Sequence, residues 1–280
     1  SMQIPTPHIA FLGGGNMATA IITGMIQKGG FLPKQISVIE HNEAQRDRLS
    51  NDLSVVCYEN TTFAHAQMPS APDIWVLAVK PQNMHEALQE LLPALKPSQM
   101  LLSIAAGLPI ATLSAWSHQH EKIVRTMPNT PALVGQGITG VFAPAINDTE
   151  RNWVNEILQS IGQVVWLNEE SQIDAITAIS GSGPAYVFYM MEQLTQDALQ
   201  LGFDPATAKQ LVQATFGGAV ALAGESTESI ATLRERVTSK GGTTAAALAK
   251  FAECGLDQAI HAGVAACKAR AEALAKELSA

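Results

Sequence analysis

The sequence predicts an α/β chain, in which an N-terminal Rossmann-type, doubly wound parallel sheet is followed by an all-α C-terminal domain. In the first part, short apolar runs alternate with amphipathic helical segments, a pattern typical of parallel strands that helices cover on both faces. After Leu167 the strand-like runs stop and only helical periodicity remains. We therefore expect one domain over residues 1–167 and a second, all-α domain over residues 168–280.

The expected strands of the first domain are short, mostly apolar runs. They span residues 8–12, 36–39, 73–79, 100–104, 122–126, 137–142 and 163–166. The clearest helices between them are expected at residues 16–27, 83–95 and 148–161. No apolar run approaches the roughly 18 to 20 residues of a membrane span, so we expect no membrane partner.

Capping residues mark the helices of the second domain. Gly183 lies at the start of a helix whose apolar residues recur at helical spacing until Gly202. Asp204 and Pro205 then supply an N-cap and a proline at the first helical position of the next helix, expected to reach about residue 223. Two more helices are expected at residues 244–253 and 256–278.

Composition narrows the function classes. Lys and Arg together number 17 against 25 Asp and Glu, and the net charge of −8 argues against a nucleic-acid partner. Only 15% of the residues are charged while 47% are apolar, so we expect a subunit interface to bury the surplus apolar surface. The three cysteines are scattered and odd in number, which fits reduced thiols and a cytoplasmic location.

A glycine-rich loop joins the first expected strand to the first expected helix. Its spacing G-x-G-x-x-A allows a tight turn, close approach of a pyrophosphate to the backbone, and close packing of helix on strand. The helix N-terminus adds N–H donors and a positive dipole end. We therefore predict a dinucleotide-binding domain, the alternative being a glycine-rich turn in an unrelated α/β protein. The expected contacts are Leu12, Gly13, Gly14, Gly15, Asn16 and Met17.

The end of the second strand bears on the choice of cofactor. Glu40 stands about where an acidic residue binds the adenosine ribose in NAD enzymes. His41, Arg46 and Arg48 follow and could meet a 2′-phosphate instead. Glu40 as a plain surface carboxylate is the third interpretation. We expect NADPH, NADH or both as cofactor, with Glu40, His41 and Asn60 among its contacts.

Three further segments begin where apolar runs end. Ligands of an open parallel sheet bind outside the carboxyl ends of the strands, so these segments are expected to line the nicotinamide end of the cleft. Ordinary turn chemistry is the alternative, because proline, glycine and asparagine are common in such turns. The expected contacts are Ala78, Val79, Lys80, Pro81, Ala105, Ala106, Gly107 and Asn129.

A polar loop near the C-terminus precedes a helix and suits a small anion. Its backbone N–H groups could face a carboxylate, with the helix dipole favouring negative charge. The expected substrate contacts are Ser239, Gly241, Gly242, Thr243 and Thr244. Simple N-capping by Thr243 or Thr244 is the alternative. The segment Ser180-Gly181-Ser182-Gly183-Pro184 is either a helix start or a second wall of the pocket.

The chain resembles the pyrroline-5-carboxylate reductase family over nearly its whole length. Matching stretches include the glycine loop, Leu77-Ala78-Val79-Lys80-Pro81, Ala105-Ala106-Gly107 and Met127-Pro128-Asn129-Thr130-Pro131. Two others are characteristic of this family. They are Ser180-Gly181-Ser182-Gly183-Pro184-Ala185-Tyr186 and Val237-Thr238-Ser239-Lys240-Gly241-Gly242-Thr243-Thr244.

The resemblance implies reduction of L-1-pyrroline-5-carboxylate to L-proline with NADPH or NADH, the final step of proline biosynthesis. It also implies a homodimer formed through intertwined helical domains, often assembled into a ring of five dimers. The substrate is a cyclic imine, and Thr244 is the best candidate for the imine contact or proton donor. The resemblance also implies Glu170 as a substrate contact, although its place at the start of the helical domain is more commonly explained as that of an ordinary carboxylate at the start of a helix.

Two alternative functions are considered beside this hypothesis, together with the question of a metal site. A β-hydroxyacid dehydrogenase would need a lysine about one turn into the helix that starts near Gly183, and no lysine occurs there before Lys209. A non-catalytic dinucleotide-binding module would have no need of the Ser239–Thr244 loop. We expect no metal site, because a pair of histidines such as His118 and His120 without a third ligand is commonly a solvated surface.

Overall fold

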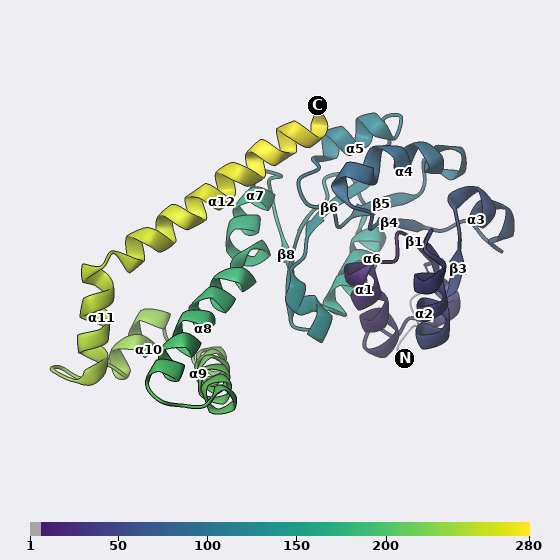
Figure 1. Cartoon of the computed structure of the whole chain (residues 1–280). Coiled ribbons are helices and arrows are strands. Elements are labelled where there is room, and N and C mark those ends of the chain that lie inside the picture. Colours follow the sequence, from purple (N-terminus) through teal and green to yellow (C-terminus); the bar gives the residue numbers. More distant parts are fainter. Residues whose placement is uncertain (1–6) are drawn as a thin grey trace. The chain divides into compact units, whose positions relative to one another are not determined.

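The structure is a computed structural model, and it describes residues 7–280. The first part of the chain forms one eight-stranded sheet in the order β3-β2-β1-β4-β5-β6-β7-β8 (Figure 1). The strands are β1 (Ile9–Leu12), β2 (Ile36–Ile39), β3 (Val56–Tyr58), β4 (Ile74–Leu77), β5 (Met100–Ser103), β6 (Ile123–Met127), β7 (Gly137–Phe142) and β8 (Gly162–Trp166). The Rossmann-type sheet predicted from sequence is confirmed.

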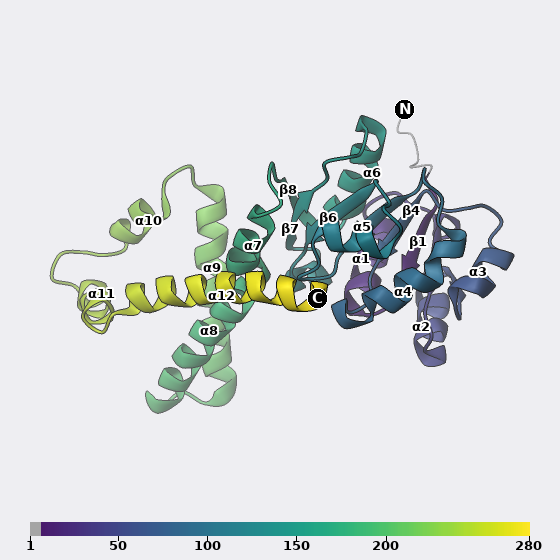
Figure 2. The same ribbon diagram turned by 90° about the horizontal axis from the view of Figure 1, so that it is seen from above.

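Helices cover both faces of this sheet, and Figure 2 shows them from above. They are α1 (Asn16–Gln27), α2 (Glu43–Leu53), α3 (Thr61–Gln67), α4 (Met84–Leu91), α5 (Ile110–Trp116) and α6 (Asp148–Gln159). Alternate residues of each strand point to opposite faces. Phe11 packs with α1, α2 and α6 in one apolar cluster, whereas Leu12 packs with α3, α4 and α5 in the other. Because helices cover both faces of the sheet, every residue of a strand such as β1 is buried, and the strand is therefore apolar throughout.

One pair of strands departs from the predicted parallel sheet. β7 runs antiparallel to β6, while β8 runs parallel to β7. The β6–β7 connection contains only a short 3₁₀ turn at Thr130–Val134, and a parallel pairing needs a crossover of about a dozen residues or more. Helix α6 provides that crossover between β7 and β8.

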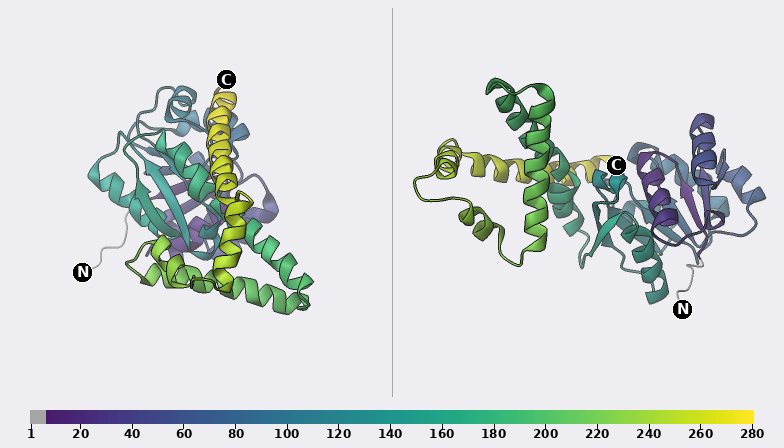
Figure 3. Two further views of the ribbon diagram at one scale, coloured as in Figure 1. Left: turned by 90° about the vertical axis from the view of Figure 1, so that its left-hand side faces the viewer. Right: turned by 90° about the horizontal axis from the view of Figure 1, so that it is seen from below.

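The second part of the chain is helical, as predicted. Its helices are α7 (Gln172–Ile176), α8 (Gly183–Gln200), α9 (Pro205–Glu225), α10 (Ile230–Arg236), α11 (Thr243–Glu253) and α12 (Leu256–Ser279), with a π-helical turn at Thr177–Gly181. Asp204 caps α9 through a hydrogen bond from the Thr207 backbone N–H. Helices α8 and α9 pack against each other, as both views of Figure 3 show. No helix in residues 7–280 is both long and apolar enough to cross a bilayer.

Packing divides the chain into two compact units. The first ends at Ser182 and also includes Cys267–Ala280, and the second is Gly183–Ala266. The last turns of α12 thus pack with the sheet-containing unit. The domain boundary expected between residues 167 and 168 rests on the change of periodicity, and it stays a prediction.

Candidate cofactor and substrate sites

The glycine loop has the geometry of a phosphate-binding turn. Gly13 has φ +101°, and a Cβ on it would lie 2.7 Å from the Ala78 carbonyl oxygen, so a larger residue would clash as well as strain the backbone. Gly15 has open space where its Cβ would be. It is also the N-cap of α1, with no side chain capping the helix. The N–H groups at the start of α1 are therefore open to an anion.

These glycines line a cavity of about 540 Å³ at the carboxyl ends of β1, β2 and β4. Its lining includes most of the predicted cofactor contacts, namely Leu12, Gly13, Gly14, Gly15, Glu40, His41, Ala78, Val79 and Lys80. Sequence reasoning missed Asn83, Glu86, Ala87 and Glu90, which line it from α4 and the turn before it. The apolar face of α4 was recognised, but nothing in its sequence marks the face that meets the cavity.

Both carboxylate oxygens of Glu40 are held by backbone N–H groups. Oε1 accepts from Gly14 at 3.1 Å, and Oε2 accepts from Asn42 at 2.9 Å. The carboxylate therefore lies against the glycine loop and does not point to solvent as a plain surface group would. A ribose hydroxyl bound near the loop could donate to the same oxygens.

The two arginines after Glu40 already have partners. Arg46 Nη1 donates to the carbonyl oxygens of Glu40 and His41, at 2.8 and 2.9 Å. Arg48 Nε donates to Gln45 Oε1 at 2.9 Å. A guanidinium has several N–H donors, so either arginine can keep these bonds and still donate to a 2′-phosphate.

Asn60 lies in a neighbouring cavity of about 750 Å³, which shares His41 and Glu90 with the first. Its side chain accepts a hydrogen bond from the Phe63 N–H at 2.7 Å and so caps α3. The exposed Phe63 ring also lines this cavity. An adenine ring could lie there against an aromatic face.

The other predicted cofactor contacts lie outside these two cavities. Pro81 lines a smaller cavity beside α5, and Ala106 is exposed next to Gly107 in the turn after β5. The Asn129 side chain is occupied, because its amide donates to the Ser180 carbonyl at 3.1 Å and its oxygen accepts from the Ile138 N–H at 3.0 Å. Their contacts with a cofactor stay predictions.

Glu170 takes part in a partly buried ion cluster. Its Oε2 accepts from the Ile110 N–H at 2.8 Å and pairs with the buried Arg125 at 3.0 Å. Asp174 lies 4.0 Å from the same guanidinium, and burial raises the pKa of its carboxyl. This cluster fixes the start of α5 to β6, and the predicted substrate contact of Glu170 stays a prediction.

Within the second unit, the Ser239–Thr244 loop leads directly into α11. Gly241 has φ +73°, and the Gly242 N–H donates to the Ser239 carbonyl at 3.0 Å. Gly242 is the N-cap of α11, which begins at Thr243. The interpretation of Thr243 or Thr244 as an N-cap is therefore wrong. A glycine N-cap has no side chain to occupy the first N–H groups, so these can bind an anion.

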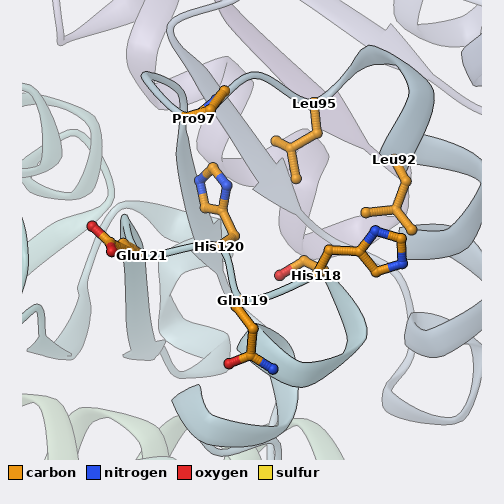
Figure 4. Close-up of a pocket in the computed structure, with 8 residues that line it drawn as sticks. Leu92, Leu95, Pro97, His118, Gln119, His120 and Glu121 are labelled. Atoms are coloured by element: carbon orange, nitrogen blue, oxygen red, sulfur yellow. The ribbon is translucent and has the colours of Figure 1, made fainter.

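A cavity of about 410 Å³ lies by His118 and His120, on the loop between α5 and β6. Figure 4 shows the two rings pointing to different walls, His118 toward Leu92 and His120 toward Pro97. His120 Nε2 donates to the Gln99 carbonyl at 2.6 Å. In the part of the chain that the structure describes, no three His, Cys, Asp or Glu side chains are grouped for a metal ion.

The fold and the glycine loop define a Rossmann-type, dinucleotide-dependent oxidoreductase with a helical second unit. Two family models match: "Pyrroline-5-carboxylate reductase dimerisation" over residues 170–274, and "NADP oxidoreductase coenzyme F420-dependent" over residues 8–107. The pyrroline-5-carboxylate reductase of Pseudomonas aeruginosa is 40% identical over 98% of both chains. That of Haemophilus influenzae is 42% identical over 94% of this chain and 96% of its own.

Solved structures give the same result. A pyrroline-5-carboxylate reductase from Coxiella burnetii has a TM-score of 0.87 and 35% identity, over 96% of this chain and 99% of its own. The Plasmodium falciparum pyrroline carboxylate reductase, solved with NADP bound, has a TM-score of 0.84 and 27% identity, over 98% of this chain and 100% of its own. The chain belongs to the pyrroline-5-carboxylate reductase family.

Proposed function

We propose that this chain reduces L-1-pyrroline-5-carboxylate to L-proline with NADPH or NADH, as the last step of proline biosynthesis. The observation that carries the proposal is the presence, in one chain of this family, of two helix starts with open N–H groups. One follows the glycine loop in the first unit, and the other follows the Ser239–Thr244 loop in the second. They match the two anionic groups of the reaction, a pyrophosphate and a substrate carboxylate.

The cofactor would be held by the loop after β1 and the residues around it. The backbone N–H groups of Gly15 and Asn16 would bind the pyrophosphate, because Gly15 leaves space for close approach. Those of Gly13 and Gly14 already donate to Ile39 and Glu40. Glu40 would accept from the adenosine ribose, and His41 and Asn60 would lie near the adenine half. Ala78, Val79 and Lys80 continue the lining toward the nicotinamide end. When bound, reduced nicotinamide supplies a hydride for C2, the imine carbon of the substrate ring.

The substrate needs little acid–base chemistry from the protein. Once its ring nitrogen is protonated, the imine carbon C2 is electrophilic, and a hydride added there, at the carbon that becomes C5 of proline, leaves the neutral amine. Backbone N–H groups of Gly241, Thr243 and Thr244 would bind the carboxylate, with Ser239 and Gly242 beside them, since the Gly242 N–H already donates to the Ser239 carbonyl. The half-buried Thr244 hydroxyl would contact the ring nitrogen. Catalysis would thus rest on positioning and charge pairing.

Assembly follows from the same family. The match to a dimerisation model and the exposed apolar side chains of α8 and α9 support a homo-oligomer. We propose a homodimer through the helical unit, assembled further into a ring of five dimers, in the cytoplasm. On α9, Gly217 and Gly218 have open space around them within the chain, so a second helix could approach closely there.

A steady-state assay tests the proposed activity. Oxidation of NADH or NADPH is followed with L-1-pyrroline-5-carboxylate. In parallel, reduction of the oxidised cofactors is followed with 2-hydroxy and 3-hydroxy acids. We expect turnover with the imine alone. Comparable turnover of a hydroxy acid would favour a β-hydroxyacid dehydrogenase, and cofactor binding without turnover would favour a non-catalytic module. The family comparisons favour neither alternative.

A further inference from the structure

The end of α12 packs against a turn expected at the nicotinamide end of the cleft. Leu278 Cδ1 lies 3.1 Å from the position that a Cβ on Gly107 would take, and the Leu274 Cβ lies 3.9 Å from it. Gly107 has φ +79°, a conformation that costs a glycine little and other residues more. Leu278 also packs on the apolar cluster that contains Ala105 and Leu108. Its side chain therefore covers one side of this turn.

The same helix end makes two more contacts in this unit. Thr112 Oγ1, in α5, donates to Ser279 Oγ at 2.6 Å. Leu278 and Ala280 share a cavity of about 300 Å³ with Pro81 and Gln82, in the turn after β4. Figures 1 and 2 both place the end of α12 beside α5. Residues 278–280 thus lie against the turns that follow two neighbouring strands, β4 and β5.

The Ala105–Gly107 turn is exposed at its centre, between the buried residues Ala105 and Leu108. Ala106 is exposed and Gly107 is only half-buried, and a short exposed turn with a glycine in the left-handed region gains much conformational freedom when a neighbour is removed. A ligand that needs one turn conformation then binds more weakly, since it must order the turn itself.

We propose that Leu278 is a positioning residue for the cofactor: the end of α12 holds the Ala105–Gly107 turn in the conformation that receives the nicotinamide end. This role rests on the proposed function, because it assumes that the turn lines a cofactor site. Leu278 does not itself touch the cofactor. The helical part of the chain thereby contributes to the dinucleotide site, which is otherwise formed by residues that precede it in the sequence.

Leu278→Ala tests this role, with Leu95→Ala as its matched control. Both leucines are partly buried and pack on the same apolar cluster. Leu95, however, lines the cavity by His118 and His120 and not the turns. Both variants lose the same side-chain atoms, so their thermal stabilities should fall by similar amounts. Dissociation constants for NADH and NADPH are measured by fluorescence titration, and hydrogen exchange of residues 105–108 is measured without cofactor.

For Leu278→Ala we expect about five- to tenfold weaker cofactor binding and faster exchange in residues 105–108, with neither change in Leu95→Ala. Equal dissociation constants and equal exchange in the two variants would overturn the proposal. Should Leu278→Ala fail to fold, Thr112→Val removes only the hydrogen bond to Ser279 and should also speed exchange of the turn. An unmodified chain that binds neither cofactor would defeat the proposed function, while the exchange comparison would still decide whether Leu278 orders the Ala105–Gly107 turn.

Discussion

The Glu40 carboxylate accepts a hydrogen bond from the backbone N–H of Gly14 at 3.1 Å. This bond joins the end of β2 to the loop after β1, and it brings a negative charge to the part of the cavity where an adenosine ribose would lie. A 2′-phosphate within about 4 Å of that carboxylate would lose roughly 1 to 4 kcal/mol, depending on the effective dielectric constant. The nearby Arg46 and Arg48 can offset part of that cost, because each guanidinium keeps N–H donors beyond those in its present bonds.

We therefore expect the chain to accept both cofactors, with the preference for NADPH weakened by Glu40. Glu40→Ser should raise kcat/KM for NADPH relative to NADH about tenfold, which corresponds to roughly 1.4 kcal/mol. The ratio is measured by steady-state kinetics with saturating imine. Glu43→Ser, which removes an exposed carboxylate at the start of α2 and leaves Glu40 in place, is a suitable control. An unchanged ratio in Glu40→Ser would show that Glu40 does not face the ribose.

Gly13 and Gly15 should respond differently to the same substitution. Gly13→Ala meets both an unfavourable φ and the Ala78 carbonyl oxygen, so the free energy of unfolding should fall by about 2 to 4 kcal/mol. Gly15→Ala has φ −76° and open space, so stability should change little while cofactor binding weakens. Urea unfolding and fluorescence titration separate the two effects. Similar loss of stability in both variants would contradict this account of the loop.

Gly218 on α9 should be essential to assembly. A bulky side chain has room within the single chain, so Gly218→Leu should leave the fold of a monomer possible while preventing close approach of a second helical unit. We expect dissociation, or unfolding of the released subunits with their exposed apolar surface. Light scattering at micromolar concentration measures the mass. A well-folded monomer of the unmodified chain would refute the proposed interface.

His8 should make stability depend on pH. Its Nε2 lies 2.9 Å from Ser37 Oγ, and burial holds the pKa of the imidazole below its ordinary value of 6.5. The unfolded chain then binds more protons than the folded one at mildly acidic pH. The contribution of His8 to stability is therefore present above pH 6.5 and is lost as the pH falls toward the folded-state pKa.

Urea unfolding between neutral and mildly acidic pH tests this effect. The free energy of unfolding should fall with pH in the unmodified chain and fall less in His8→Gln, whose amide reaches the position of Nε2 beside Ser37. His65→Gln is the matched control, because that imidazole is exposed on α3. Parallel pH profiles for all three proteins would show that His8 has no such role.

Much of the fold could be predicted from the sequence, and the misses have physical causes. Helix α1 and strand β7 have the predicted bounds, since an apolar pattern and a glycine mark both. Strand β3 was missed because it has only three residues, two of them partly or fully exposed. Helix α2 was missed because it is mostly polar, with Leu49 as its one buried residue. Its Asn42 N-cap was the available signal.

The candidate site was predictable where the backbone itself is the binding group. The glycine loop and the strand-end residues Ala78, Val79 and Lys80 follow from position alone, since parallel strands end at one edge. Hydrogen bonds between side chains and residues distant in the sequence could not be predicted from the sequence. Asn129 bonds to Ser180 and Ile138, and Glu170 bonds to Ile110 and Arg125. No local pattern encodes those partners.

Isotope transfer tests the central claim most directly. The purified chain is incubated with L-1-pyrroline-5-carboxylate and reduced nicotinamide cofactor that carries deuterium at both C4 positions, and the product is analysed by mass spectrometry and NMR. We predict L-proline with one deuterium at C5, formed in equal amount to the oxidised cofactor. Oxidation of the cofactor without labelled proline, or no reaction by a chain that binds the cofactor, would contradict the proposed function.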